Sequence, residues 1–256
     1  MESIRRFFDP PERSFFLLGP RGTGKSTWLR TACPDALTLD LLRPDVFRDL
    51  SARPERLEGL VGGTAPTATV VLDEVQRVPE LLAVVHRLIE TPGTSRRFIL
   101  TGSSARKLRR GGTDLLGGRA SMCTMHPFMA AELGRFDLAD ALRVGLLPIV
   151  VASASPDEVL RAYASLYLDE EVRQEGLTRN VGAFARFLEV ASFSHGAVVN
   201  TANLARECQV ERKSVANYLG ILEDLLLAFR VPVFTRRAQR ATSVHPKLYY
   251  FDAGVY

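Results

Sequence analysis

The chain has 256 residues, of which 46% are hydrophobic and 24% charged, and its formal net charge is +4. This composition is typical of a soluble globular protein with enough apolar material for a buried core. No apolar run approaches the roughly 20 residues of a membrane span, and the start, MESIRRFFDPPERS, lacks the apolar stretch of a signal peptide. These features argue against a membrane or secreted protein, and we expect a cytoplasmic protein with no membrane partner.

The mild positive charge permits an acidic partner such as a nucleic acid without requiring one. The three cysteines, Cys33, Cys123 and Cys208, lie far apart in the chain. Their spacing fits neither a metal site nor a disulfide framework, so we expect reduced thiols.

Short apolar runs alternate with helical stretches along the first half of the chain. This alternation predicts an α/β fold, in which a parallel sheet carries helices on both faces. The predicted helices begin near Lys25, Pro44 and Pro79. The predicted strands cover residues 14–19, 36–42, 69–74, 97–104 and 120–128.

Polar residues follow three of these strands, at Lys25–Ser26, Asp73–Glu74 and Thr101–Ser104. Ligands of parallel sheets bind at the carboxyl ends of the strands. We therefore expect these three segments to meet at one site.

The segment GPRGTGKS, between the first strand and the first helix, satisfies the P-loop pattern G-x-x-x-x-G-K-[ST]. Glycines let such a loop curl so that its N–H groups point at phosphate oxygens, and the following helix adds its positive end. Lys25 would reach the β- and γ-phosphates of a nucleotide, Ser26 would hold Mg²⁺, and Thr27 could contact the α-phosphate. The predicted nucleotide-binding residues are Gly19, Pro20, Arg21, Gly22, Thr23, Gly24, Lys25, Ser26 and Thr27.

The run VVLDE ends a buried strand with two carboxylates. Asp73 is placed to hold the metal ion through water, and Glu74 to polarise a water for in-line attack on the γ-phosphate. The alternative for Asp73 is a helix cap, and the alternative for Glu74 is a surface carboxylate at a strand end.

Two further residues complete a predicted catalytic set with Lys25 and Glu74. The hydroxyls of LTGSS could act as a sensor between the base and the γ-phosphate, and Ser103 is favoured over Thr101. Arg119, on the glycine turn LLGGRA, could contact the γ-phosphate in its own chain or in a neighbouring subunit of a homo-oligomer. The alternative for Arg119 is a surface arginine.

The pattern changes beyond Phe128. A helix is predicted from Ser155, with Glu158 completing a capping box, and another over 181–194. Residues 200–227 predict two helices joined by a tight turn, and two strand-like runs around a basic loop follow. This order is typical of a winged helix-turn-helix. The apolar face of its second helix is expected to contain Val215, Leu219, Leu222 and Leu226.

We therefore predict three parts: a P-loop core over 1–128, a helical lid or linker over 129–178, and a winged helix-turn-helix domain over 179–256. The second helix of such a domain enters the DNA major groove. Acidic residues, beginning with Glu211, weaken the electrostatic case for DNA, and a packing or protein-contact module is the alternative. The predicted DNA-contacting residues are Arg212, Lys213, Ser214 and Asn217 in the helix and Arg236, Arg237 and Arg240 in the wing.

The segments GPRGTGKST, VVLDEVQRVPEL, RFILTGSSARKL, GGRA and HPF, in this order, resemble a family of prokaryotic AAA+ ATPases. In that family a C-terminal domain of unknown function follows the P-loop domain, and RNVGAFARFLEVAS, YLGILEDLLLAFRVPVF and HPKLYYFDAGVY are similar to it. Family members usually continue into a nuclease-like domain, whereas this chain ends at Tyr256, so no activity of such a domain is assigned. The resemblance implies ATP, Mg²⁺ and the roles given above to Lys25, Ser26, Asp73, Glu74, Ser103 and Arg119.

We expect an ATPase that couples ATP binding and hydrolysis to movement of the winged helix, in nucleic-acid-linked regulation. Two other hypotheses stay open. One is a nucleotide-gated protein-interaction scaffold with negligible turnover, and the other is a DNA-binding regulator with a structural ATP site. ATP turnover distinguishes the first, and salt-sensitive DNA binding the second.

Overall fold

The computed structural model describes residues 4–104, 115–167, 180–232 and 246–256. The chain divides into two compact units, Met1–His126 and Pro127–Tyr256. The division falls close to the predicted end of the P-loop core at residue 128. The predicted boundary between residues 178 and 179 adjoins residues outside the described ranges and stays a prediction.

The first unit is built on a five-stranded sheet with the strand order β2-β3-β4-β1-β5. All neighbouring strands pair in parallel, so the predicted parallel sheet is confirmed. Phe15, Phe16 and Leu17 of β1 are completely buried. A strand whose sheet is covered by helices on both faces has apolar side chains on both sides. The strands are β1 (Phe15–Leu18), β2 (Leu37–Asp40), β3 (Thr69–Asp73), β4 (Arg97–Gly102) and β5 (Ser121–Thr124).

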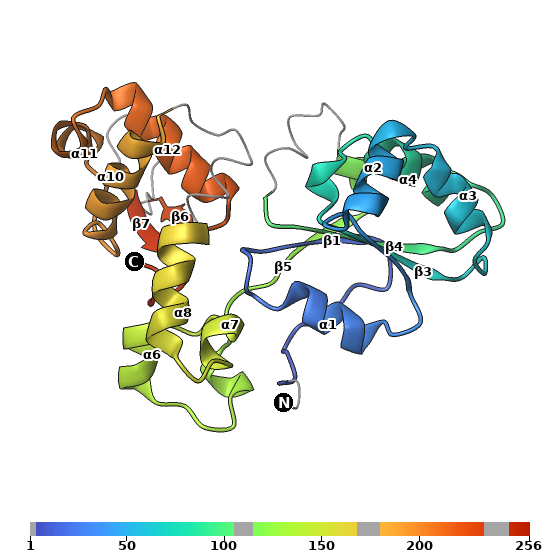
Figure 1. Ribbon diagram of the computed structural model, residues 1–256, viewed down its shortest axis with the longest axis horizontal. Helices are drawn as coiled ribbons and strands as arrows, with labels where there is room; N and C mark the ends of the chain where they lie inside the picture. The colour runs from blue at the N-terminus through green and yellow to red at the C-terminus, as the bar shows by residue number, and fades with distance from the viewer. Residues whose placement is uncertain (1–3, 105–114, 168–179, 233–245) are drawn as a thin grey trace, which may run out of the picture. The chain divides into compact units, whose positions relative to one another are not determined.

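Helices lie on both faces of this sheet, as predicted (Figure 1). The chain passes from β1 to β2 in one direction across the sheet and returns through β3 to β4 in the other. Right-handed crossovers in opposite directions place their helices on opposite faces. Accordingly α1 (Lys25–Ala32) covers one face, and the other face carries α2 (Pro44–Ala52), α3 (Arg56–Gly62) and α4 (Leu81–Glu90).

Helix α1, which follows the P-loop, is held on the sheet by an apolar cluster. Leu29 is buried with Phe15 and Leu17 of β1, Val71 of β3, Ile99 of β4 and Met125 directly after β5. Trp28 packs against the same cluster, and its ring lies edge-on to Phe8 with 4.9 Å between centroids. This packing fixes the start of α1 relative to the strand ends.

The second unit is mostly helical, and its described residues form two hydrophobic clusters. Val144, Leu147, Val150 and Tyr163 form the smaller cluster, and Phe251 packs against both. Among the described residues, no helix combines the length and apolar character needed to cross a membrane. The elements are η3 (Ala130–Glu132), α6 (Leu138–Val144), α7 (Pro148–Val151), α8 (Pro156–Ala162), η4 (Tyr163–Tyr167), α10 (Val181–Ser192), α11 (Thr201–Cys208), α12 (Arg212–Asp224), β6 (Ala228–Val231) and β7 (Lys247–Tyr250).

The larger cluster joins α10, α11, α12 and the antiparallel pair β6–β7, in the chain order predicted above. Asn200 caps α11, because its Oδ1 accepts the backbone N–H groups of Ala202 and Asn203. Gln209, with φ of +56°, ends α11 and turns the chain tightly into α12. Helix α12 is fixed to α10 by the ring of Tyr218, which lies 5.2 Å from Phe184 and 5.3 Å from Phe187 between centroids.

Two local predictions are wrong. Ser155 precedes α8 but its side chain makes no capping hydrogen bond, so the predicted capping box does not form. Leu226 does not extend the apolar face of α12, although Val215, Leu219 and Leu222 are buried as predicted. The helix ends at Asp224, and Leu226 has φ of +59° in a Schellman turn closed by the Leu227 N–H on the Leu222 carbonyl.

Candidate functional site

The P-loop residues, Gly19 to Thr27, form the loop after β1 and the first turn of α1. Gly22 and Gly24 have φ values of +83° and +88°, a left-handed backbone that glycine adopts without side-chain strain. A Cβ atom on Gly19 would lie 2.4 Å from the carbonyl oxygen of Met125. Glycine is therefore required at two positions by backbone conformation and at a third by close packing.

Lys25, the first residue of α1, is buried against the loop that precedes it. Its Nζ donates hydrogen bonds to the carbonyl oxygens of Gly19 and, at 3.1 Å, Pro20. Thr23 Oγ1 donates to the same Pro20 oxygen at 2.8 Å. The ammonium group thus lies within the loop predicted to receive phosphates.

Ser26 and Asp73, the predicted metal ligands, are in direct contact. Ser26 Oγ donates to Asp73 Oδ2 at 2.9 Å, which links the first turn of α1 to the end of β3. Thr101, near the end of β4, donates its hydroxyl to the other oxygen, Asp73 Oδ1. These side chains meet because the carboxyl ends of parallel strands lie at one edge of the sheet.

The chemistry of this pair fits Mg²⁺, which takes oxygen ligands and completes its coordination with waters and substrate phosphates. Ser26 supplies a hydroxyl oxygen and Asp73 a carboxylate. Among the described residues, no group of three or more His, Cys, Asp or Glu side chains could hold a metal ion. Ser26 and Asp73 thus bring together oxygen atoms of the kind that Mg²⁺ binds, and their role as its ligands stays a prediction.

Glu74 has a left-handed backbone, with φ of +61° and ψ of +46°, which is uncommon for a residue with a side chain. Its N–H donates to Thr101 Oγ1 at 3.0 Å, which supports this conformation. Its buried carboxylate accepts hydrogen bonds from Gln76 Nε2 at 2.5 Å and from Ser103 Oγ at 3.4 Å. The predicted base and the predicted sensor hydroxyl thus lie together, while Thr101 lies beside Asp73.

Gln76 is a site residue that the motifs do not single out. It lies in the short helix η1 (Val75–Arg77), directly after the carboxylates, and is 3% exposed. Its Nε2 donates to Ser103 Oγ at 3.0 Å as well as to Glu74. The signal in the sequence is a polar residue following a strand end in VVLDEVQ.

Arg119 does not lie at this site. It forms an ion pair with Glu90, the last residue of α4. It precedes β5, whose first residue, Ser121, pairs with Phe15 at the start of β1, whereas the P-loop follows the end of β1. Arg119 is therefore at the opposite edge of the sheet. This position does not fit contact with phosphates in its own subunit, and contact from a neighbouring subunit stays a prediction.

Each half of the chain matches the model of a known protein family. Residues 11–134 match a family model described as an AAA domain, and residues 135–256 match one described as a domain of unknown function. The chain is an AAA domain joined to a domain of unknown function. The P-loop, Asp73, Glu74 and Ser103 all fall inside the AAA domain, so the resemblance seen in the motifs is confirmed.

A solved structure shows the same fold. The Walker-type ATPase of Pyrococcus abyssi matches with a TM-score of 0.59 and 14% sequence identity, over 94% of this chain and 89% of that chain. At this identity the likeness concerns the fold alone, which is that of a P-loop ATPase.

Curated relatives are longer than this AAA-domain chain. Uncharacterized proteins of Mycobacterium bovis and Mycobacterium tuberculosis are each 27% identical to it over 245 residues. The matched region is 93% of this chain and 54% of each relative. The chain thus spans about half the length of the curated relatives it matches.

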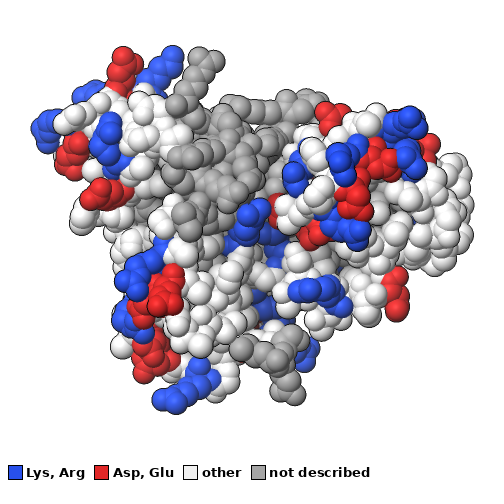
Figure 2. Space-filling view, in the orientation of Figure 1, with Lys and Arg blue, Asp and Glu red and all other residues white. Residues whose placement is uncertain are grey.

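The domain of unknown function presents three of the predicted DNA-contacting residues on the exposed side of α12. Arg212, Lys213 and Asn217 are exposed; Lys213 and Asn217 lie opposite the buried face that contains Val215 and Leu219, and Arg212 is the first residue of the helix. On the face shown in Figure 2, this domain carries basic and acidic side chains interspersed rather than one basic field. The three wing arginines, Arg236, Arg237 and Arg240, lie outside the described residues.

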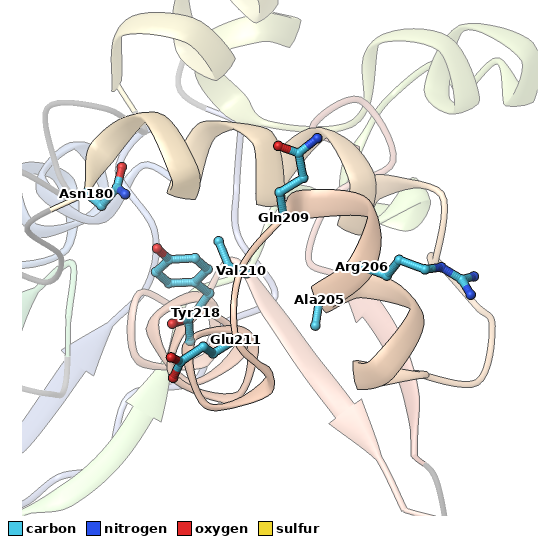
Figure 3. A pocket seen from close by; sticks show the side chains of 8 residues that line it. Asn180, Ala205, Arg206, Gln209, Val210, Glu211 and Tyr218 are labelled. Atoms are coloured by element: carbon cyan, nitrogen blue, oxygen red, sulfur yellow. The ribbon is translucent and has the colours of Figure 1, made fainter.

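Ser214 does not share that exposed surface. It lines a hollow of about 610 Å³ at the turn between α11 and α12. Figure 3 shows Glu211 and Tyr218 on one side of this hollow and Arg206 on the other, pointing away. The Glu211 carboxylate makes the hollow a poor place for a DNA phosphate, so Arg212, Lys213 and Asn217 form the more suitable surface.

Proposed function

We propose that the AAA domain binds ATP with Mg²⁺ and hydrolyses it. The observation that carries this proposal is the contact between Ser26 and Asp73 at 2.9 Å, with Glu74 directly after Asp73 in the chain. This contact joins the P-loop helix to the strand end that supplies the candidate base. The family match and the ATPase fold support the proposal.

Binding follows from the loop and the start of α1. Backbone N–H groups of the curled loop and the positive end of the helix would hold the phosphate oxygens. Lys25 would exchange its two loop carbonyls for the β- and γ-phosphates. When bound between Ser26, Asp73 and the phosphates, Mg²⁺ would neutralise phosphate charge and orient the triphosphate.

Hydrolysis would use Glu74 as the general base. The carboxylate would accept a proton from a water as the water oxygen bonds to the γ-phosphorus and the bond to ADP breaks. Ser103 Oγ lies 3.4 Å from that carboxylate and would act as a sensor by hydrogen bonding between the γ-phosphate and the base. Both side chains are buried, which keeps competing water away from them.

Replacing Glu74 by Gln tests this role. We expect ATP affinity to stay within about twofold and phosphate release to fall roughly 10²-fold or more, the range for losing a general base. Glu80→Gln, an exposed carboxylate six positions on in the same segment, is the matched control and should leave both unchanged. Equal phosphate release by Glu74→Gln and the unaltered protein would show that the base is misassigned. Negligible turnover in both, with ATP bound, would favour a nucleotide-gated scaffold.

We also propose that the C-terminal domain is a winged helix that ATP binding and hydrolysis move and that contacts DNA through α12. The exposed Arg212, Lys213 and Asn217 support this second role, since cationic and amide side chains on one helix suit phosphates and base edges. Interspersed acidic residues argue for modest affinity, and a protein-contact role is the competing outcome.

A further inference from the structure

The carboxamide of Gln76 connects two residues of the hydrolytic site that lie 29 positions apart in the chain, Glu74 and Ser103. One nitrogen, Nε2, donates to Glu74 Oε2 at 2.5 Å and to Ser103 Oγ at 3.0 Å. All three side chains are at least nine-tenths buried. Hydrogen bonds to a carboxylate in such surroundings are strong and directional, so this amide restricts where the Glu74 carboxylate can lie.

The other end of the carboxamide is unusual. Gln76 Oε1 is buried and has no hydrogen-bond partner among the described residues. An unsatisfied buried acceptor costs about 1–3 kcal/mol, so a glutamine used only to fill space would be a poor choice. An apolar side chain of similar length would fill the same volume without that cost.

Gly102 provides the space for this orientation. A Cβ atom on Gly102 would lie 2.6 Å from Gln76 Oε1, closer than non-bonded atoms approach, whereas its other neighbours would be at 3.4 Å or more. The φ angle of Gly102 is not in the left-handed region. Its lack of a side chain therefore serves the Gln76 carboxamide rather than the backbone.

We propose that Gln76 is a positioning residue of the hydrolytic site, which holds the Glu74 carboxylate and the Ser103 hydroxyl in one fixed arrangement. This inference rests on the proposed hydrolysis by Glu74. It predicts that loss of the amide donor lowers kcat and leaves ATP affinity unchanged, because Gln76 contacts neither the P-loop glycines nor Ser26 in the described hydrogen bonds.

The first test is Gln76→Met, which keeps the length of the side chain and removes its hydrogen bonds. We expect kcat to fall about 10–100-fold, the range for residues that orient a site group, and the Kd for labelled ATP to change less than twofold. The double variant Gln76→Met, Ser103→Ala should lose far less kcat than the product of the fold-losses of the two single variants. The reason is that both residues hold the same Glu74 carboxylate.

The second test reaches the same amide from the opposite side. Gly102→Ala should push the carboxamide away and lower kcat in the same direction, and it should have no effect in a Gln76→Ala background, where the clash is absent. Gly59→Ala is the matched control, since a Cβ there meets nothing within 4 Å. Thermal unfolding of each variant shows whether it folds.

These results separate the two proposals. If Glu74→Gln abolishes phosphate release while Gln76→Met and Gly102→Ala keep kcat within twofold, Gln76 is not a positioning residue although the proposed function stands. If both variants lose ATP affinity and thermal stability together with kcat, the role of Gln76 is structural only. If Glu74→Gln has no effect, the proposed function itself fails.

Discussion

Ser26 Oγ lies 2.9 Å from Asp73 Oδ2, although 47 positions separate the two residues in the chain. The contact joins two motifs that are recognisable separately in the sequence, the P-loop and the carboxylates that end β3. It places a hydroxyl and a carboxylate together at the edge of the sheet where parallel strands end.

This pair predicts how the protein responds to Mg²⁺. Ser26→Ala and Asp73→Asn should each raise the Mg²⁺ concentration needed for half-maximal ATP turnover by about 10–100-fold, because each removes an oxygen that fits or orients the ion. Turnover measured across a Mg²⁺ titration checks this. Asp45 is an exposed carboxylate that forms an ion pair with Arg43. As the control, Asp45→Asn should need the same Mg²⁺ concentration as the unaltered protein. Unchanged half-saturation in both site variants would exclude the pair as ligands.

The position of Arg119 predicts a dependence on association between copies. Because it lies at the sheet edge away from its own P-loop, it can reach a γ-phosphate only in a neighbouring subunit. If Arg119 acts there as an arginine finger, turnover per chain should rise with protein concentration, and Arg119→Ala should remove that rise with a loss on the order of 10³-fold. Glu90→Gln breaks the ion pair but keeps the cation, so it should retain the concentration dependence. Concentration-independent turnover in the unaltered protein would contradict the role.

Helix α10 and the residue that ends it offer a matched pair for stability. Phe187 is completely buried in the core of the C-terminal unit, whereas Phe193 is 84% exposed. Phe187→Ala should lower the free energy of unfolding of this unit by about 3–5 kcal/mol, and Phe193→Ala by less than about 0.5 kcal/mol. Urea unfolding followed by circular dichroism measures both. Similar effects of the two substitutions would show that the core is not packed as described.

The exposed side of α12 predicts a specific salt dependence. If this side of α12 contacts DNA phosphates, the double variant Arg212→Ala, Lys213→Ala should show a weaker salt dependence. The negative slope of log affinity against log salt should decrease in magnitude by about 2. Arg48→Ala with Arg53→Ala removes the same charge from exposed positions of the AAA domain and should leave the slope unchanged. Binding of a labelled duplex at several salt concentrations provides the measurement. DNA binding that is absent, or insensitive to salt, would favour a protein-contact role.

The elements that the sequence predicts best are those specified by local chemistry. The strand ending at Asp73 and the loop from Gly19 follow from apolar runs and from glycines that the backbone requires. The contact between Ser26 and Asp73 could be anticipated because Asp73 ends one strand of the parallel sheet and Ser26 lies shortly after the end of another.

The remaining features depend on tertiary packing that no local pattern specifies. The proposed role of Gln76 depends on a hydrogen bond to Ser103, directly after β4, and on the space left by Gly102. Arg119 was recognisable as a cation on a glycine turn, but only the strand register shows which edge of the sheet it occupies. At Leu226, a helix-ending turn replaces the expected continuation of an apolar face.

The most direct test of the whole account is the affinity of Lys25→Ala for labelled ATP in the presence of Mg²⁺. The buried ammonium lies against the predicted phosphate-binding loop, and loss of its charge-assisted hydrogen bonds should weaken binding by about 10–100-fold. Lys247→Ala, an exposed lysine of the C-terminal unit, serves as the control with unchanged affinity. A folded Lys25→Ala protein that binds ATP as tightly as the unaltered chain would contradict the assignment of this loop as the nucleotide site.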